Sequence, residues 1–205
     1  MSQDDLSFSS YQLRILLRRT SPHVWRRIVI PGHFTLTQLH QTICILFGWS
    51  NAHPAHFVIR GKSFAADPIT AGETVGPPPL SEFQFYARER FLYDYRFELQ
   101  IPVWRHEIRV EKTASRQARG DLFRCLAGAG SPPPPPVASP QEFQQMQELF
   151  TSGYLLHRLA DLIDGGASEQ RLASELRYLR PWLTAGEFRS GEANRQLQGL
   201  NGASQ

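Results

Sequence analysis

The sequence has little of what marks secreted, membrane-bound or disulfide-stabilised proteins. It has two cysteines, Cys44 and Cys125, far apart in the chain, which argues against a disulfide scaffold and fits a reducing cytoplasm. No run of about 18 apolar residues is present, so no transmembrane helix is expected. The polar, acidic start MSQDDLSFSS has no signal-peptide pattern. We therefore expect a cytoplasmic protein with no membrane partner.

The usual catalytic motifs are also missing. The sequence contains no Gly-rich phosphate loop, no nucleophile elbow and no HExxH helix. It has no catalytic Ser accompanied by the Arg array of a recombinase. Asp94 and Glu98 could form a carboxylate pair for acid–base catalysis, but charged residues on the solvent face of a strand are far commoner. We assign no catalytic residue, expect no cofactor and favour a non-enzymatic protein, although the sequence leaves this open.

Lysine is scarce, because 20 of the 22 basic residues are arginines. Five of them lie within fourteen residues of the first half: Arg14, Arg18, Arg19, Arg26 and Arg27. A planar guanidinium forms bidentate contacts with phosphates and carboxylates, so this cluster could contact nucleic acid. The formal net charge of only +3 favours a simpler interpretation, a solvated strand face.

An α+β fold is indicated by the first fifty residues. The stretches 11–19, YQLRILLRR, and 24–30, VWRRIVI, alternate apolar and polar residues and are predicted to form a hairpin. A helix follows, because Thr35 and Gln38 form a capping box and Gly48 supplies the C-terminal stop. A helix placed directly after a hairpin indicates a roll-like fold in which the helix packs across a mostly antiparallel sheet.

The segment 91–111, FLYDYRFELQIPVWRHEIRVE, is predicted to form two further strands. Two alternating sets of residues define their apolar faces: Tyr93, Tyr95 and Phe97 in the first strand, and Trp104, His106, Ile108 and Val110 in the second. A histidine beside a tryptophan on the apolar side of a strand is either a packed core residue or part of a site.

The remaining elements follow from turn and cap signals. We expect a strand at 56–61, an exposed loop at 65–80, strand material from 80 to 97, irregular polar chain at 113–130 and a polyproline spacer at 132–136. Four helices are predicted to follow: one capped by Ser139, one at 154–164, one at 168–180 ended by Pro181, and one capped by Thr184 and Glu187. The predicted organisation is an α+β domain of residues 1–131, a spacer of 132–140, and helices in 141–205 packed on the same domain.

Several stretches together resemble the plasmid pRi ORF-three-like family, which includes the TnpR-like passenger proteins of insertion elements. They are YQLRILLRRTSPHVWRRIVIP, LTQLHQTICILFGWSNAHPAHFVIRGKSF, RERFLYDYRF, WRHEIRVE and the C-terminal RYLRPWLTAGEFRSGEANRQL. The resemblance implies a compact α+β fold of roll-like architecture and a link to mobile genetic elements. No biochemical activity is established for the family, so the resemblance implies no reaction.

The chain departs from the family pattern at two places. The family's acidic Gly-Asp turn before Trp104 is replaced by a longer, more apolar connection, with Arg96 where the first Asp is expected. Downstream, Cys125 and Gly128 are retained, but Ser131 replaces the second Cys of the family. If the family's acidic and Cys residues bind a metal or ligand, the resemblance implies that this site is impaired here.

A metal site is the weaker of the site hypotheses. His53 and His56 form an HxxH pair, and with His106 and Cys125 they could supply the His and Cys ligands that a transition metal prefers. Of the pair, only His53 falls on the usual His of the family. Structural roles are more common for such residues.

The favoured interpretation is a non-enzymatic accessory protein of a mobile genetic element that contacts a protein or nucleic acid. The predicted binding residues are Arg14, Arg18, Arg26, Arg27, Trp104, Arg105 and His106. Two alternatives stay open: a metal-dependent hydrolase using His53 and His106 with nearby carboxylates, and a protein-only adaptor or inhibitor of a host defence system that uses the Pro-rich segment and the C-terminal helices. The oligomeric state is not predicted.

Overall fold

A seven-stranded antiparallel sheet forms the centre of the molecule, with strand order β4-β3-β5-β6-β1-β2-β7. The computed structural model describes residues 10–66, 77–97, 103–114, 123–135, 137, 139–183 and 188–202. The strands are β1 Ser10–Leu17, β2 Val24–Pro31, β3 Ala55–Ile59, β4 Lys62–Ala65, β5 Arg90–Tyr95, β6 Trp104–Ala114 and β7 Arg124–Ala129. The helices are α1 Leu36–Phe47, the short 3-10 helix η2 Leu80–Phe83, α3 Pro140–Leu149, α4 Ser152–Asp164, α5 Glu169–Leu183 and α6 Ser190–Gly202.

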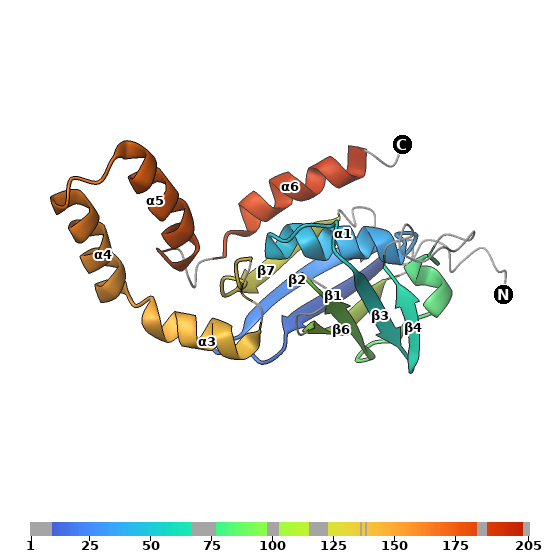
Figure 1. The fold of residues 1–205 in the computed structure, drawn as a ribbon. Helices are drawn as coiled ribbons and strands as arrows, with labels where there is room; N and C mark the ends of the chain where they lie inside the picture. The colour runs from blue at the N-terminus through green and yellow to red at the C-terminus, as the bar shows by residue number, and fades with distance from the viewer. Residues whose placement is uncertain are drawn as a thin grey trace, which may run out of the picture.

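The predicted α+β fold is confirmed: α1 follows the first hairpin and crosses one face of the sheet, and a helical segment ends the chain (Figure 1). The capping box forms as expected, with Thr35 N donating to Gln38 Oε1 at 2.8 Å and Gln38 N donating to Thr35 Oγ1 at 3.3 Å. Gly48 ends α1 at φ 64°, a left-handed conformation that glycine adopts without the usual steric cost.

The core lies between the sheet and α1. The inward residues of β1, β2 and β6 alternate as predicted, and α1 covers them with one apolar stripe. The largest fully buried side chains include Trp104, Tyr93, Tyr95, Phe47 and Phe57. Both predicted apolar faces of the segment 91–111 are therefore confirmed as core.

Several predicted boundaries are wrong. Residues 124–129 form β7, which pairs with β2, although 113–130 was expected to be irregular. Residues 80–83 form a 3-10 helix instead of strand. Pro181 lies inside the last turn of α5 and does not end it, and the final helix begins at Ser190. The expected caps Thr184 and Glu187, most of the 65–80 loop and the divergent connection at 98–102 lie outside the described residues.

Several hydrogen bonds join the C-terminal half to the sheet domain. The indole of Trp49 donates to Pro133 O at 3.0 Å, and that of Trp104 donates to Val137 O at 3.3 Å. On α6, which lies beside α1 (Figure 1), the Asn194 amide accepts from Cys125 N at 2.7 Å and donates to Cys125 O at 3.0 Å. The two Asn194 bonds satisfy backbone groups of β7 at the edge of the sheet. The predicted division at 131 and 140 stays a prediction.

Candidate functional site

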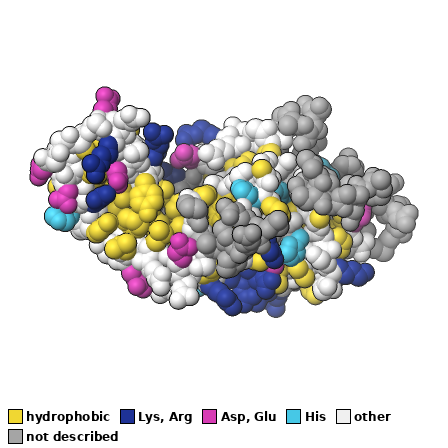
Figure 2. Space-filling model, in the orientation of Figure 1, with side chains coloured by type: hydrophobic (Ala, Val, Ile, Leu, Met, Phe, Trp, Pro, Cys, Tyr) yellow, Lys and Arg dark blue, Asp and Glu magenta, His cyan; other side chains and the backbone are white. Residues whose placement is uncertain are grey.

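The sheet face opposite α1 carries many charged side chains. Among the described helices, none lies on this face (Figure 1). Its central side chains are half-buried or exposed: Gln12, Arg14, Leu16, Trp25, Arg27, Val29, Arg105, Glu107, Arg109 and Glu111. Figure 2 shows Lys and Arg side chains gathered in dark blue along the lower edge of the molecule, beneath the sheet. We call this surface the open face.

Four arginines stand directly opposite one another on four adjacent strands of the open face. Arg90 on β5 pairs with Arg109 on β6, which pairs with Arg14 on β1, which pairs with Arg27 on β2. With about 4.8 Å between strands, this row spans roughly 14 Å. Like charges directly opposite each other on a sheet destabilise it, so folding alone gives no reason for such a row.

Among the described residues, carboxylates form ion pairs only with the two ends of this arginine row, and Arg14 has a weaker Coulombic interaction with Glu111. Arg27 binds Glu111 with two bonds of 2.6 and 2.9 Å, and this guanidinium, helped by Gln12, lowers the pKa of Glu111. At the other end Arg90 lies 3.5 Å from Glu107.

The central pair is left without such partners. Arg14 and Arg109 make no ion pair in the described part of the chain, and their buried Nε atoms have no hydrogen-bond acceptor. The Arg14 guanidinium lies 5.0 Å from the centre of the Trp25 ring, and that of Arg27 lies 5.4 Å from it. The indole therefore holds both cations in place without neutralising them.

Arg18 and Arg105 extend the open face beyond the row. Arg18 follows β1 directly, and its backbone N–H donates to Arg105 O at 2.9 Å. Arg105 binds Asp94 through two bonds of 2.7 and 2.6 Å. Of the seven predicted binding residues, the structure thus brings Arg14, Arg18, Arg27 and Arg105 onto one surface. Their binding role stays a prediction.

The other three predicted binding residues are buried, so the expectation that they lie on the surface is wrong. Trp104 and His106 are 0% exposed and Arg26 is 2% exposed, because all three lie on the buried face of the sheet. Arg26 donates to four backbone carbonyls at 2.8 to 3.0 Å: Trp25, Leu46, Ala129 and Gly130. Its guanidinium also lies between the rings of Phe47 and Phe188. Burial lowers the pKa of Arg26 to about 10, so it stays charged at neutral pH.

His106 is a core residue enclosed by aromatic rings. Phe47 and Trp49 meet its ring edge-on at centroid distances of 4.7 and 5.2 Å, and Tyr93 lies 5.2 Å away. Neither ring nitrogen has a hydrogen-bond partner of ordinary geometry. Burial lowers the pKa of His106 to about 3, and the nearby backbone of Tyr93 and Trp104 offsets only part of this effect. The imidazole is therefore neutral at physiological pH.

The metal-ligand candidates are not gathered into one site. His53 packs against the rings of Tyr95 and Phe97, while His56 lies 3.5 Å from Asp94. Cys125 is on β7, separated from β6 and His106 by β1 and β2. Among the described residues, no group of three or more His, Cys, Asp or Glu side chains could hold a metal ion. Burial also raises the pKa of the Cys125 thiol to about 11, which disfavours the thiolate that a metal requires.

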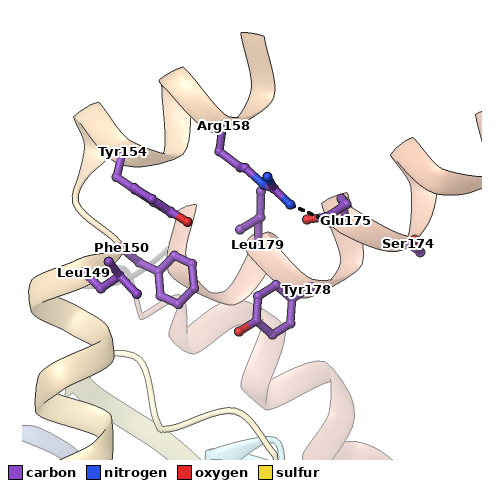
Figure 3. Close-up of a pocket in the computed structure, with 8 residues that line it drawn as sticks. All are labelled: Leu149, Phe150, Tyr154, Arg158, Ser174, Glu175, Tyr178 and Leu179. Atoms are coloured by element: carbon purple, nitrogen blue, oxygen red, sulfur yellow. Dashed lines mark hydrogen bonds and ion pairs between the residues drawn. The ribbon is translucent and has the colours of Figure 1, made fainter. Parts of the chain in front are cut away.

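A hollow of about 410 Å³ lies between α3, α4 and α5 (Figure 3). It is lined by Leu149, Phe150, Tyr154, Arg158, Ser174, Glu175, Tyr178 and Leu179. The Phe150 ring lies 5.6 Å from that of Tyr154 and 5.8 Å from that of Tyr178. The two charged groups of the lining, Arg158 and Glu175, pair with each other at 3.0 Å. The hollow thus offers apolar and aromatic surface, without a free charge for an anion.

The sequence reasoning missed Arg90 and Arg109, which complete the row. One signal was present: Arg105, Glu107, Arg109 and Glu111 alternate along β6, which places all four on one face. The sequence does not show that Arg109 lies beside Arg14. This placement depends on the register between β1 and β6, two strands far apart in the sequence.

Comparison with known proteins identifies the family. The family model of the plasmid pRiA4b ORF-3-like proteins matches residues 9–154. The chain belongs to this family. The predicted resemblance is therefore confirmed, and the matched part of this pRiA4b ORF-3-like protein contains all seven strands, α1 and α3. Every arginine of the open face lies within it.

One relative and one solved structure show how far the likeness extends. The uncharacterized protein y4hQ of Sinorhizobium fredii (strain NBRC 101917 / NGR234) is 29% identical over 147 residues, which cover 68% of this chain and 72% of the relative. The crystal structure of MM3350, a protein of unknown function from Methanosarcina mazei Go1, matches with a TM-score of 0.63 at 20% identity. That match covers 90% of this chain and 97% of the other. This structural match shows only that the two proteins share a fold.

Proposed function

We propose that this pRiA4b ORF-3-like protein is a non-enzymatic, cytoplasmic accessory protein of a mobile genetic element that binds nucleic acid through the phosphate backbone. The observation that carries the proposal is the arginine row of the open face, in which Arg14 and Arg109 form no ion pair with any carboxylate of the described residues. A row of aligned like charges costs stability, and a polyanion bound along it would remove that cost. The plasmid in the family's description supports the link to a mobile element.

The chemistry of the open face favours phosphates over bases. Guanidinium groups match phosphate geometry in a bidentate manner, whereas a lysine presents only a point charge. The aromatic residue of this face, Trp25, lies beneath the guanidiniums of Arg14 and Arg27, so its ring is not free to stack on a base. We therefore propose binding to the backbone with little sequence preference, since base stacking and base-edge contacts would supply such preference.

The proposal predicts that neutralising the centre of the row weakens binding. The Arg14→Gln/Arg109→Gln variant is expected to bind a fluorescein-labelled oligo-dT of about 20 nucleotides at least about tenfold more weakly than the wild type, as measured by fluorescence anisotropy at low salt. The matched control is Arg171→Gln/Arg177→Gln, which removes two exposed charges from α5 and should bind like the wild type. Equal weakening by both variants would show a non-specific charge effect and contradict the proposal.

The helical hollow favours a second candidate function, that of a protein-only adaptor. Three apolar or aromatic residues of the hollow lie together and are partly exposed: Leu149 at 53%, Tyr154 at 39% and Tyr178 at 52%. A partner protein that is retained by the Arg14→Gln/Arg109→Gln variant but lost from Tyr178→Glu would support the adaptor. Loss of the same partner from both variants would count against it.

A further inference from the structure

We propose that the cavity formed by Arg18, Arg19 and Arg105 at the end of the open face binds the terminal phosphate of a nucleic-acid strand. This inference rests on the proposed function and adds an end preference to it. The cavity has a volume of about 320 Å³ and is lined by Arg18, Arg19, Val103, Arg105 and Pro140. That volume falls at the lower end of the range for small-ligand pockets, about 300 to 1,000 Å³.

The cavity is continuous with the open face. Arg105 belongs to the outward side of β6, in line with Glu107 and Arg109. Arg18 lies beside it, because its backbone N–H donates to Arg105 O. Arg14 and Arg18 are four residues apart on β1 and its continuation, so the cavity lies roughly 13 Å from the arginine row. A nucleic-acid strand that crosses the row at Arg14 and Arg109 and follows the direction of β1 can therefore reach the cavity with its end.

The turn after β1 directs two consecutive arginines into the same cavity. In an extended strand, neighbouring side chains point to opposite faces of the sheet. Arg19 instead adopts φ 62°, a left-handed conformation that costs a non-glycine residue on the order of 1 kcal/mol or more. Thr20 secures this turn: its hydroxyl donates to Leu17 O at 3.1 Å and accepts from Val24 N at 3.1 Å. The conformation lets Arg18 and Arg19 line one cavity.

The charge in the cavity matches a phosphomonoester better than an internal diester. Arg105 is paired with Asp94, whereas Arg18 and Arg19 form no ion pair in the described part of the chain. A terminal phosphate carries a charge of about −1.5 to −2 near pH 7, compared with about −1 for each internal phosphate. Two uncompensated guanidiniums therefore favour the strand end. Pro140, the first residue of α3, completes the cavity wall.

The test compares oligo-dT probes of about 20 nucleotides that end in a 5′-phosphate, a 3′-phosphate or hydroxyls only. The wild type should bind one phosphorylated probe about tenfold more tightly than the hydroxyl-ended probe. Arg18→Gln/Arg19→Asn should abolish this preference, so that the phosphorylated and hydroxyl-ended probes bind this variant equally, with Asn chosen because it tolerates the left-handed conformation. Arg14→Gln/Arg109→Gln should weaken binding of all probes alike.

Each other outcome overturns a defined part of the account. Equal affinity of the wild type for all three probes, or a preference that survives in Arg18→Gln/Arg19→Asn, overturns the terminal-phosphate site while the proposed function stands. No binding of any probe overturns both. Tight binding of a phosphoserine peptide with no binding of oligo-dT assigns the cavity to a phosphoprotein and overturns the nucleic-acid inference. Urea unfolding of each variant shows that the comparison is made on folded protein.

Discussion

Replacing Arg26 with Met is expected to lower the free energy of unfolding by about 3–5 kcal/mol. Arg26 joins three separate elements, because its guanidinium donates to Leu46 O at the end of α1 and to Ala129 O and Gly130 O at the end of β7. A methionine of similar length fills the space but leaves these acceptors without their donor. Each unsatisfied buried carbonyl costs about 1–3 kcal/mol, partly offset by no longer burying a cation. Urea unfolding at pH 7 measures the difference.

The neighbouring residue provides a matched control for this prediction. Arg27→Met makes the same chemical change one position along β2, on the opposite face, where the arginine is 34% exposed and paired with Glu111. A surface ion pair contributes about 0–1 kcal/mol, so the cost should stay within that range. Similar costs for the two variants would show that the buried guanidinium does not join α1 to β7 as described.

Replacing His106 with Phe is expected to remove much of the protein's sensitivity to mild acid. In the unfolded chain the imidazole has its ordinary pKa of 6.5, whereas burial lowers it to about 3 in the folded protein. Below pH 6.5 the unfolded state therefore binds a proton that the folded state does not bind. The part of the free energy of unfolding that depends on the neutral His106 imidazole is fully present above pH 6.5. It is lost as the pH falls toward 3, by up to about 1.4 kcal/mol per pH unit.

Urea unfolding at pH 7, 6, 5 and 4 tests this prediction. His106→Phe should have a shallower decline than the wild type across this window, since Phe packs against the same rings and takes up no proton. His33→Phe is the control, because His33 is exposed. This variant should lose stability with falling pH as the wild type does. Parallel curves for wild type and His106→Phe would show that the buried imidazole is not the group responsible.

Much of the fold was predicted correctly, because residues close together in the sequence determine these helices and strands. The hairpin, the capping box of Thr35 and the alternation in 91–111 each depend on residues close together in the sequence. β7 was missed because RCLAGA has no clear alternation, and its strand conformation depends on pairing with β2 and on the Asn194 amide. Pro181 was expected to end a helix, but it occupies the last turn and interrupts only one hydrogen bond of the helix.

The open face was predicted only in part, because strand alternation can be read from the sequence whereas helix packing and strand register cannot. Alternation along β2 places Arg26 and Arg27 on opposite faces of the sheet, so only one of them can lie beside Arg14. Which side carries the core depends on where α1 packs, and the buried acceptors of Arg26 come from α1 and β7. For Trp104 and His106, the alternation gave the correct shared face but not whether that face was covered. Arg109 beside Arg14 follows from strand register alone.

The salt dependence of nucleic-acid binding tests the central claim most directly. For a single strand, log Kobs falls with log salt concentration by about 0.7 for each phosphate contact. If Arg14 and Arg109 each contact a phosphate, the slope for oligo-dT should be less steep by about 1.4 in the Arg14→Gln/Arg109→Gln variant than in the wild type. The Arg171→Gln/Arg177→Gln control should keep the wild-type slope. Identical slopes for wild type and the Arg14→Gln/Arg109→Gln variant, or an affinity that does not change with salt, would contradict the claim that the open face binds the phosphate backbone.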